Sequence, residues 1–227
     1  MKAKTLKIFL ALFCAVCFSG NYCFADEVAQ PVAQPVVQEA AQQQELAMQK
    51  EEAKKSIFSS IDVLSGYAWS KLKAKSDMEL KRDYDFYPVF VGLGFNLKNL
   101  TKRIGFNPPV TFEFQLEPYV AYVSSPDANV EFGNSFLLKL GLVPENWKLQ
   151  LYAKAGVGVS YMTNHTWEQS TQFNFIESGG LGAKYFLTKN FALIAEGRMR
   201  HLSNAGVKQP NHGINTYFAL AGVSYKY

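Results

Sequence analysis

A stretch near the C-terminus, RHLSNAGVKQPNHGIN (residues 200–215), gathers side chains that could perform ester chemistry. His201 and Ser203 are two residues apart, and a serine hydroxyl becomes a nucleophile when a neighbouring base removes its proton. That base needs a third group to orient it, and Asn215 is the candidate. Donors for an oxyanion could come from the turn after the serine and from the residues beyond it, namely the backbone at Ala205 and Gly206 and the side chains of Asn204 and Asn211.

The chain begins with the features of a secretory signal peptide, over residues 1–25. Three lysines precede the apolar run Ile8–Phe18, which is shorter than the roughly 18 to 20 residues that a spanning helix needs. We therefore expect cleavage near Ala25 rather than a membrane anchor. All three cysteines lie in this segment, so we expect a mature chain with no disulfide, zinc site or cysteine nucleophile.

The composition of the mature chain favours a transmembrane β-barrel. Three of the 23 basic residues leave with the signal, so 20 remain against 19 acidic residues, which gives no case for a nucleic-acid partner. Aromatic residues make up 15% of the chain, yet no mature segment has 18 uninterrupted apolar residues. A signal peptide, many aromatic residues and apolar residues spread at every second position are typical of outer-membrane barrels.

Two regions follow the signal peptide. Residues 26–56 are rich in Gln, Ala and Glu and contain no aromatic residue, which predicts a disordered or partly helical periplasmic lead-in. Residues 57–227 show no repeat of 20 to 50 residues, and they predict a single all-β domain, an eight-stranded antiparallel barrel.

A two-residue alternation marks the strands. From Trp147 to Tyr161 the odd positions are apolar or aromatic, and the even positions are mostly polar or small. One face of such a strand suits hydrocarbon and the other suits a polar interior. The eight expected strands are roughly 58–72, 85–97, 112–122, 134–143, 147–161, 173–187, 191–203 and 214–227.

The connections between these strands predict which end of the barrel faces the cell exterior. Short turns are expected on the periplasmic side and long polar loops outside. An eight-stranded barrel is filled by its own side chains, so we expect no diffusion pore. The short turns are 144–146 and 188–190, and the long loops are about 73–84, 124–133, 164–172 and 204–213.

The same alternation places the candidate residues. Glu196, Arg198 and Arg200 share the interior face, where Glu113 and Glu117 could pair with the arginines.

His201 and Ser203 take the opposite, lipid-facing side at the outer end of their strand. Folding the last two strands about the loop centre near residue 208 puts Asn215 roughly opposite His201. We expect these three side chains to converge outside the barrel, at the depth of the outer-leaflet headgroups. Glu177 would reach His201 only if the strand register differed by one residue, and His165 and His212 are expected to be loop residues.

The motif His201-x-Ser203-Asn204-Ala205-Gly206, followed by Pro210-Asn211-x-Gly213, resembles the signature of the PagL-type lipid A 3-O-deacylases, the acyloxyacyl hydrolase family. This resemblance implies an eight-stranded outer-membrane barrel that removes the ester-linked acyl chain at the 3-position of lipid A. It implies His201 as general base and Ser203 as nucleophile, with Asn204, Gly206 and Asn211 shaping the oxyanion hole and its loop. The sequence departs from the family at Asn215, where well-known members carry a glutamate.

The expected function is therefore a serine hydrolase in the outer membrane of a Gram-negative bacterium, with its site facing the outer leaflet. Its substrate would be lipid A within lipopolysaccharide, and the mechanism requires neither metal nor cofactor. Two alternatives remain open: a non-catalytic barrel with a structural or loop-mediated binding role, and an esterase for another lipid, such as a phospholipase. The accepted acyl chain length and the formation of a homodimer are also left open.

Overall fold

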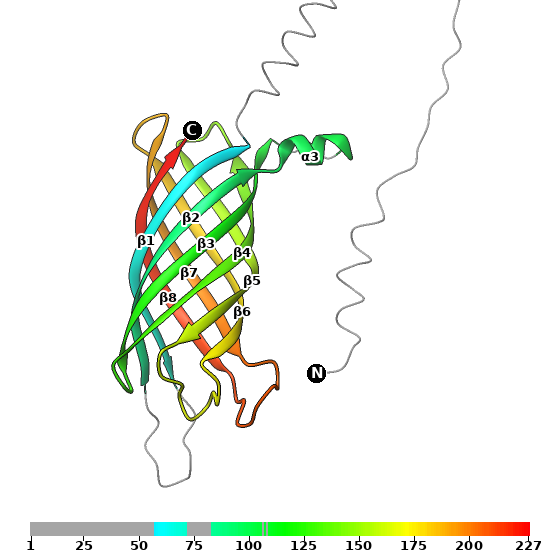
Figure 1. The fold of residues 1–227 in the computed structure, drawn as a ribbon. Coiled ribbons are helices and arrows are strands. Elements are labelled where there is room, and N and C mark those ends of the chain that lie inside the picture. Colours follow the sequence, from blue (N-terminus) through cyan, green and yellow to red (C-terminus); the bar gives the residue numbers. More distant parts are fainter. Residues whose placement is uncertain (1–56, 72–82, 106, 108) are drawn as a thin grey trace, which may run out of the picture. The chain divides into compact units, whose positions relative to one another are not determined.

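The computed structural model describes residues 57–71, 83–105, 107 and 109–227. The expected signal peptide at 1–25 and lead-in at 26–56 lie outside these residues, as does most of the expected loop at 73–84. In the described part of the chain no helix is long and apolar enough to cross a membrane. Eight antiparallel strands of that part close into one barrel, in sequence order (Figure 1). The predicted fold class is confirmed.

Each strand pairs with its neighbours in the sequence, and the first strand closes the barrel against the last. A short helix, α3, lies in the connection between the second and third strands, at the same end of the barrel as the C-terminus (Figure 1). The elements are β1 Phe58–Lys71, β2 Asp83–Asn96, α3 Lys98–Arg103, β3 Val110–Ser125, β4 Asn129–Pro144, β5 Leu149–Met162, β6 Phe173–Phe186, β7 Phe191–Ser203 and β8 Ile214–Lys226.

Burial alternates along the strands with the expected two-residue period. On β5, Leu149, Leu151 and Val157 are exposed on the outer wall, whereas Tyr152 and Lys154 are buried inside. This arrangement follows from the pleat, which sends successive side chains to opposite faces of a strand. An outer wall of exposed Val, Leu, Phe, Tyr and Trp side chains is the surface that a bilayer requires of a barrel.

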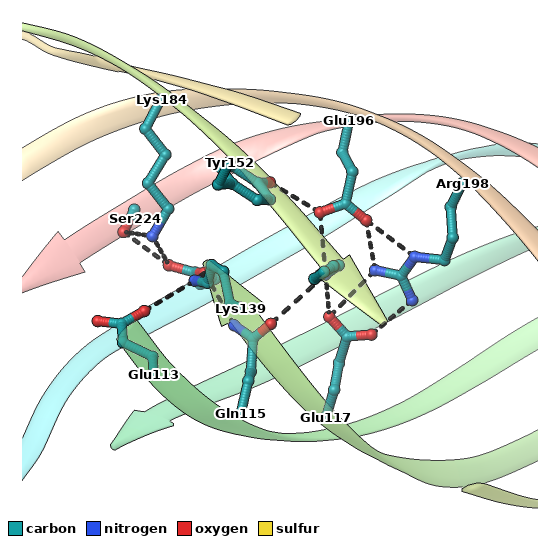
Figure 2. A network of polar contacts seen from close by, with 11 residues as sticks. Glu113, Gln115, Glu117, Lys139, Tyr152, Lys184, Glu196, Arg198 and Ser224 are labelled. Atoms are coloured by element: carbon teal, nitrogen blue, oxygen red, sulfur yellow. Dashed lines mark hydrogen bonds and ion pairs between the residues drawn. The ribbon is translucent and has the colours of Figure 1, made fainter. Parts of the chain in front are cut away.

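One group of buried charges fills the barrel toward the end that carries α3. The Asp62 carboxylate accepts hydrogen bonds from Lys139 Nζ at 2.9 Å, Lys184 Nζ at 2.7 Å and Ser224 Oγ at 2.6 Å. Lys139 Nζ also lies 3.1 Å from Glu113 Oε2 (Figure 2). Because several strands contribute to each carboxylate, these contacts tie opposite walls of the barrel together.

A second group continues this network deeper into the barrel. Lys154 Nζ lies 2.8 Å from Glu117 and 2.9 Å from Glu196, and the Tyr152 hydroxyl donates to Glu196 at 2.7 Å. Arg198 bonds to both glutamates (Figure 2). These side chains occupy the barrel interior, as predicted for a barrel of eight strands. The expected pairing of Glu117 with an arginine is confirmed, whereas Glu113 pairs with Lys139 instead.

The expected loop at 124–133 is wrong in extent. Strand β3 continues to Ser125 and β4 begins at Asn129, so residues 126–128 alone form the connection. Glu131 therefore lies inside the barrel, fully buried, where it binds Arg200, Tyr84 and Tyr119. The turn-forming residues Pro126 and Asp127 suggested a longer loop, but the alternation resumes directly after them. The helix α3 was also not predicted.

We expect Asp62→Asn to destabilise the barrel strongly. This change keeps the side chain's shape but leaves the ammonium groups of Lys139 and Lys184 buried with less opposing charge. Loss of one partner of a buried ion pair typically costs about 3–5 kcal/mol. Urea unfolding of the refolded protein in lipid vesicles, followed by tryptophan fluorescence, should show a lower midpoint than Asp127→Asn, a matched change at an exposed turn. Equal midpoints for the two variants would contradict this account of the interior.

Candidate active site

The candidate residues lie at the end of the barrel opposite to α3. The connections 163–172 and 204–213 extend from that end, in yellow and orange (Figure 1). His201 and Ser203 lie at the C-terminal end of β7 and are half-buried on the outer wall. Leu202, which lies between them, and Arg200, which precedes them, are buried inside the barrel. The pair is therefore on the outside of the barrel, as the alternation predicts.

Asn215 lies directly opposite His201 in the pairing of β7 with β8. Its side-chain oxygen Oδ1 is 2.7 Å from Nδ1 of the imidazole. A carbonyl oxygen can only accept a hydrogen bond, so Nδ1 carries the proton and donates it. In the neutral imidazole the other ring nitrogen, Nε2, then keeps its lone pair, which is the form that a general base requires.

Glu177 is also directly opposite His201, on the other neighbouring strand, and its side chain is exposed on the same outer wall. The expectation that it would need a one-residue shift in register is wrong. The β6–β7 turn is centred on Lys189, and this centre fixes the pairing of Glu177 with His201. Asn215 nevertheless makes the hydrogen bond to the ring.

Glu196 is buried in the interior network, as its position in the alternation predicts.

Ser203 lies two residues beyond His201 on β7, opposite Phe175 of β6. Within the described residues its hydroxyl makes no hydrogen bond. Residues two apart on a strand have their Cα atoms roughly 6.5 Å apart and their side chains on the same face, so a side-chain rotation can bring the hydroxyl toward the imidazole. Catalytic hydrogen bonds are often loose in proteins without bound substrate.

The connection after Ser203 is a tight turn built by asparagine side chains. Ala205 and Gly206 both have positive φ, at 53° and 80°. Asn204 Oδ1 accepts from the Gly206 N–H at 3.0 Å, and Asn204 Nδ2 donates to the Lys208 carbonyl at 2.8 Å. Asn211 Oδ1 accepts from the Asn204 N–H at 3.0 Å. A non-glycine residue in the left-handed region is uncommon, and these contacts hold the turn in that conformation.

This turn changes the expected set of oxyanion donors. The side chain of Asn204 and the N–H of Gly206 are both used within the turn itself. Two donors remain without a partner among the described residues, the Ala205 N–H and the Nδ2 group of Asn211. The anchored Oδ1 of Asn211 fixes the amide so that its NH₂ group points away from the Asn204 backbone.

The neighbouring connection, residues 163–172, supports the turn. Gln169 and Asn211 form a β-bridge, and the Trp167 ring lies against the His212 ring with centroids 5.1 Å apart. Gln169 Nε2 also donates to the Leu202 carbonyl at 3.3 Å. His212 is therefore part of the loop structure, as expected, and so is exposed His165. The contribution of Trp167 and Gln169 was not predicted, because irregular loops leave no periodic signal in the sequence.

Among the described residues, no three His, Cys, Asp or Glu side chains gather as ligands for a metal ion. The chemistry that these side chains offer is that of a base, a nucleophile and neutral donors.

We expect Asn204→Ala to loosen the turn, because both of its side-chain contacts to the turn backbone are lost. Trypsin should then cut after the exposed Lys208 severalfold faster, since proteolysis follows local opening. Cleavage after Lys189, at the other end of the barrel, serves as the internal reference, and Asn164→Ala in the neighbouring connection is the matched variant. An unchanged ratio of the two cleavage rates in Asn204→Ala would show that Asn204 does not hold the turn.

Comparisons with known proteins identify the family of the chain and agree with the barrel fold. Residues 89–224 match the family model described as "Lipid A 3-O-deacylase (PagL)", which covers more than half of the chain. The crystal structure of the outer membrane enzyme PagL is similar at 15% identity and a TM-score of 0.50, over 72% of this chain and 97% of that one. Neisserial surface protein A has 12% identity and a TM-score of 0.49, over 76% of this chain and 98% of its own. Curated protein sequences give no significant match. The chain belongs to the PagL family of lipid A 3-O-deacylases.

Proposed function

We propose that the protein is a serine esterase of the outer membrane that hydrolyses the ester-linked acyl chain at the 3-position of lipid A. The observation that carries this proposal is the hydrogen bond from His201 to Asn215, on the lipid-facing wall and next to Ser203. Membership of the PagL family supports the enzyme class and lipid A as substrate. The outer-membrane location follows from the same family and from the apolar wall of the barrel.

The position of these residues suits a lipid substrate. A site on the outer wall meets an acyl ester within the membrane, without extraction of the lipid into water. On the same wall, β6, β7 and β8 carry small side chains farther along the barrel, where Gly197 faces Ala219 and Ala195 faces Ala221. These residues line a shallow hollow, together with Leu181. The hollow lies roughly 13–20 Å from His201 along the strands, within the apolar band, where a hydrocarbon chain can lie.

The proposed reaction has two steps. Ser203 Oγ attacks the ester carbonyl carbon while Nε2 of His201 takes the hydroxyl proton. The tetrahedral intermediate collapses, the C–O bond to the sugar breaks, and the imidazolium returns the proton to the departing sugar oxygen. Water then attacks the acyl-serine with the same base, releasing the fatty acid and restoring the Ser203 hydroxyl.

Two neutral donors are available for the oxyanion that forms on the carbonyl oxygen. The Ala205 N–H and Asn211 Nδ2 belong to the turn that begins directly after Ser203, and the asparagine contacts hold that turn rigid. Fixed donors at a developing negative charge commonly contribute about 2.7–4 kcal/mol each to the rate. The expected role of Asn211 is kept in this proposal, whereas Asn204 and Gly206 act by shaping the turn.

Asn215 sets the tautomer of His201 but supplies no negative charge to the imidazolium that forms during the reaction. In a serine protease, an amide in place of the triad carboxylate costs on the order of 10⁴ in turnover when the wrong tautomer results. The 2.7 Å contact gives the useful tautomer here, so most of that loss is avoided. A non-catalytic barrel would leave this contact and the rigid turn beside it without a role.

Ser203→Ala and His201→Ala should each abolish deacylation, because one removes the nucleophile and the other the base. Release of 3-hydroxy fatty acid from purified lipid A in detergent micelles should fall at least 10³-fold, in line with triad losses in other serine hydrolases. Heat-modifiable migration in gels should persist in both variants, which shows that the barrel is folded.

The matched controls for these variants are Ser124→Ala and His165→Ala, both exposed and distant from the site in sequence. Both should keep near-normal rates. A folded Ser203→Ala or His201→Ala variant with near-normal release would overturn the assignment. Equal release of fatty acid from glycerophospholipids would instead favour a phospholipase.

The Asn215 series tests the orienting group. Asn215→Ala should lower turnover well below that of the natural protein, because the imidazole loses the acceptor at Nδ1. Asn215→Glu should equal or exceed the natural rate, since a carboxylate accepts the same hydrogen bond and adds a charge that stabilises the imidazolium. The rates are compared on lipid A at matched folded fraction. If Asn215→Ala keeps the natural rate, Asn215 has no orienting role and Glu177→Gln becomes the decisive variant.

A further inference from the structure

Gly213 lies directly before β8 and has a φ of 72°, in the left-handed region. A Cβ atom built on this residue would be 2.5 Å from Cε1 and 3.1 Å from Nε2 of His201. Carbon atoms do not approach that closely, so any L side chain at this position would compete with the imidazole for the same space. The backbone of Gly213 thus packs closely against the Cε1–Nε2 edge of the ring.

This close approach separates Gly213 from other glycines of similar conformation. Gly105 and Gly206 have φ values of 77° and 80°, and a Cβ atom on either would meet nothing within 4 Å. An alanine at any of these three positions suffers backbone strain of similar size. At Gly213 alone among the three does the substitution also collide with another side chain, and that side chain is His201.

Contacts with the connection 163–172 hold the Gly213 backbone in place. The N–H of His212 donates to the Glu168 carbonyl at 3.0 Å, and Asn211 bridges to Gln169. The ring contact between Trp167 and His212 adds a packed surface at the residue that precedes Gly213. The backbone that faces the imidazole is therefore tied to a second segment of the chain and cannot easily give way.

We propose that Gly213 is a positioning residue for His201. The hydrogen bond to Asn215 fixes the Nδ1 side of the imidazole, and the Gly213 backbone confines the Cε1–Nε2 edge, so the two contacts together set the direction of the Nε2 lone pair. A base must be aimed at the Ser203 hydroxyl as well as be in the right tautomer. This inference rests on the proposed function for its catalytic consequence, but the geometric confinement of the ring can be measured without any reaction.

The kinetic test compares Gly213→Ala with Gly105→Ala, which carries the same strain at the far end of the barrel. Gly213→Ala should lower kcat by about 10²-fold, the scale of a 1 Å misplacement of a catalytic group, while KM stays within about twofold. Gly105→Ala should keep the natural kcat. Retention of kcat within threefold in Gly213→Ala would overturn the proposal, and a change confined to KM would assign Gly213 to substrate binding instead.

A second test needs no activity. Proton and nitrogen NMR of the histidine rings in micelles should show the His201 Nδ1–H, hydrogen-bonded in the natural protein, exchanging faster or shifted in Gly213→Ala and unchanged in Gly105→Ala. If the natural protein fails to deacylate lipid A, the proposed function is wrong. A changed His201 signal in Gly213→Ala would still support the positioning role. Unchanged His201 signals in Gly213→Ala would overturn it whatever the activity.

A double variant covers the case in which Gly213→Ala does not fold. Removing the ring removes the collision, so His201→Ala combined with Gly213→Ala should fold with a urea midpoint close to that of His201→Ala combined with Gly105→Ala. Coupling between two residues in contact appears as this non-additivity. A double variant as unstable as Gly213→Ala alone would show that backbone strain, and not contact with His201, explains the glycine.

Discussion

The two-residue alternation of the β-strand is the constraint on which the rest of this structure depends. It sends Arg200 and Leu202 into the barrel and leaves His201 and Ser203, their neighbours in sequence, on the outer wall. The closed ring of eight strands can therefore satisfy a network of buried ion pairs inside and still present a polar cluster to lipid. The buried charges and the candidate site thus lie on opposite faces of the same strand.

The interior network and the outer site require different kinds of rigidity. Inside, ion pairs such as Asp62–Lys139 join opposite walls, and removal of either partner leaves a buried charge uncompensated. Outside, uncharged groups flank the imidazole: the amide of Asn215 lies at Nδ1 and the Gly213 backbone lies near the Cε1–Nε2 edge. The asparagine contacts in the turn after Ser203 leave the Ala205 N–H and Asn211 Nδ2 without a partner among the described residues. In the proposed mechanism, the position of these groups around the imidazole compensates for the missing carboxylate of the triad.

The sequence predicts those features that follow from periodicity. The barrel, the outward position of His201 and Ser203, and the pairing of His201 with Asn215 all follow from counting along alternating strands. Glu131 was missed because Pro126 and Asp127 resemble the start of a long loop. The position of Glu177 was missed although the expected turn at 188–190 is centred on Lys189 and therefore already pairs Glu177 with His201. The contacts of Trp167 and Gln169 with the turn join two irregular segments, for which no local pattern exists.

The most direct measurement is mass spectrometry of lipid A after incubation with the purified, folded natural protein. We predict loss of one acyl group, with fragmentation placing the loss at the ester of the 3-position, and an equal amount of free 3-hydroxy fatty acid. Lipid A that keeps every acyl chain, while heat-modifiable migration proves the barrel to be folded, would contradict it. Loss of an acyl group from another position would contradict the assigned substrate bond.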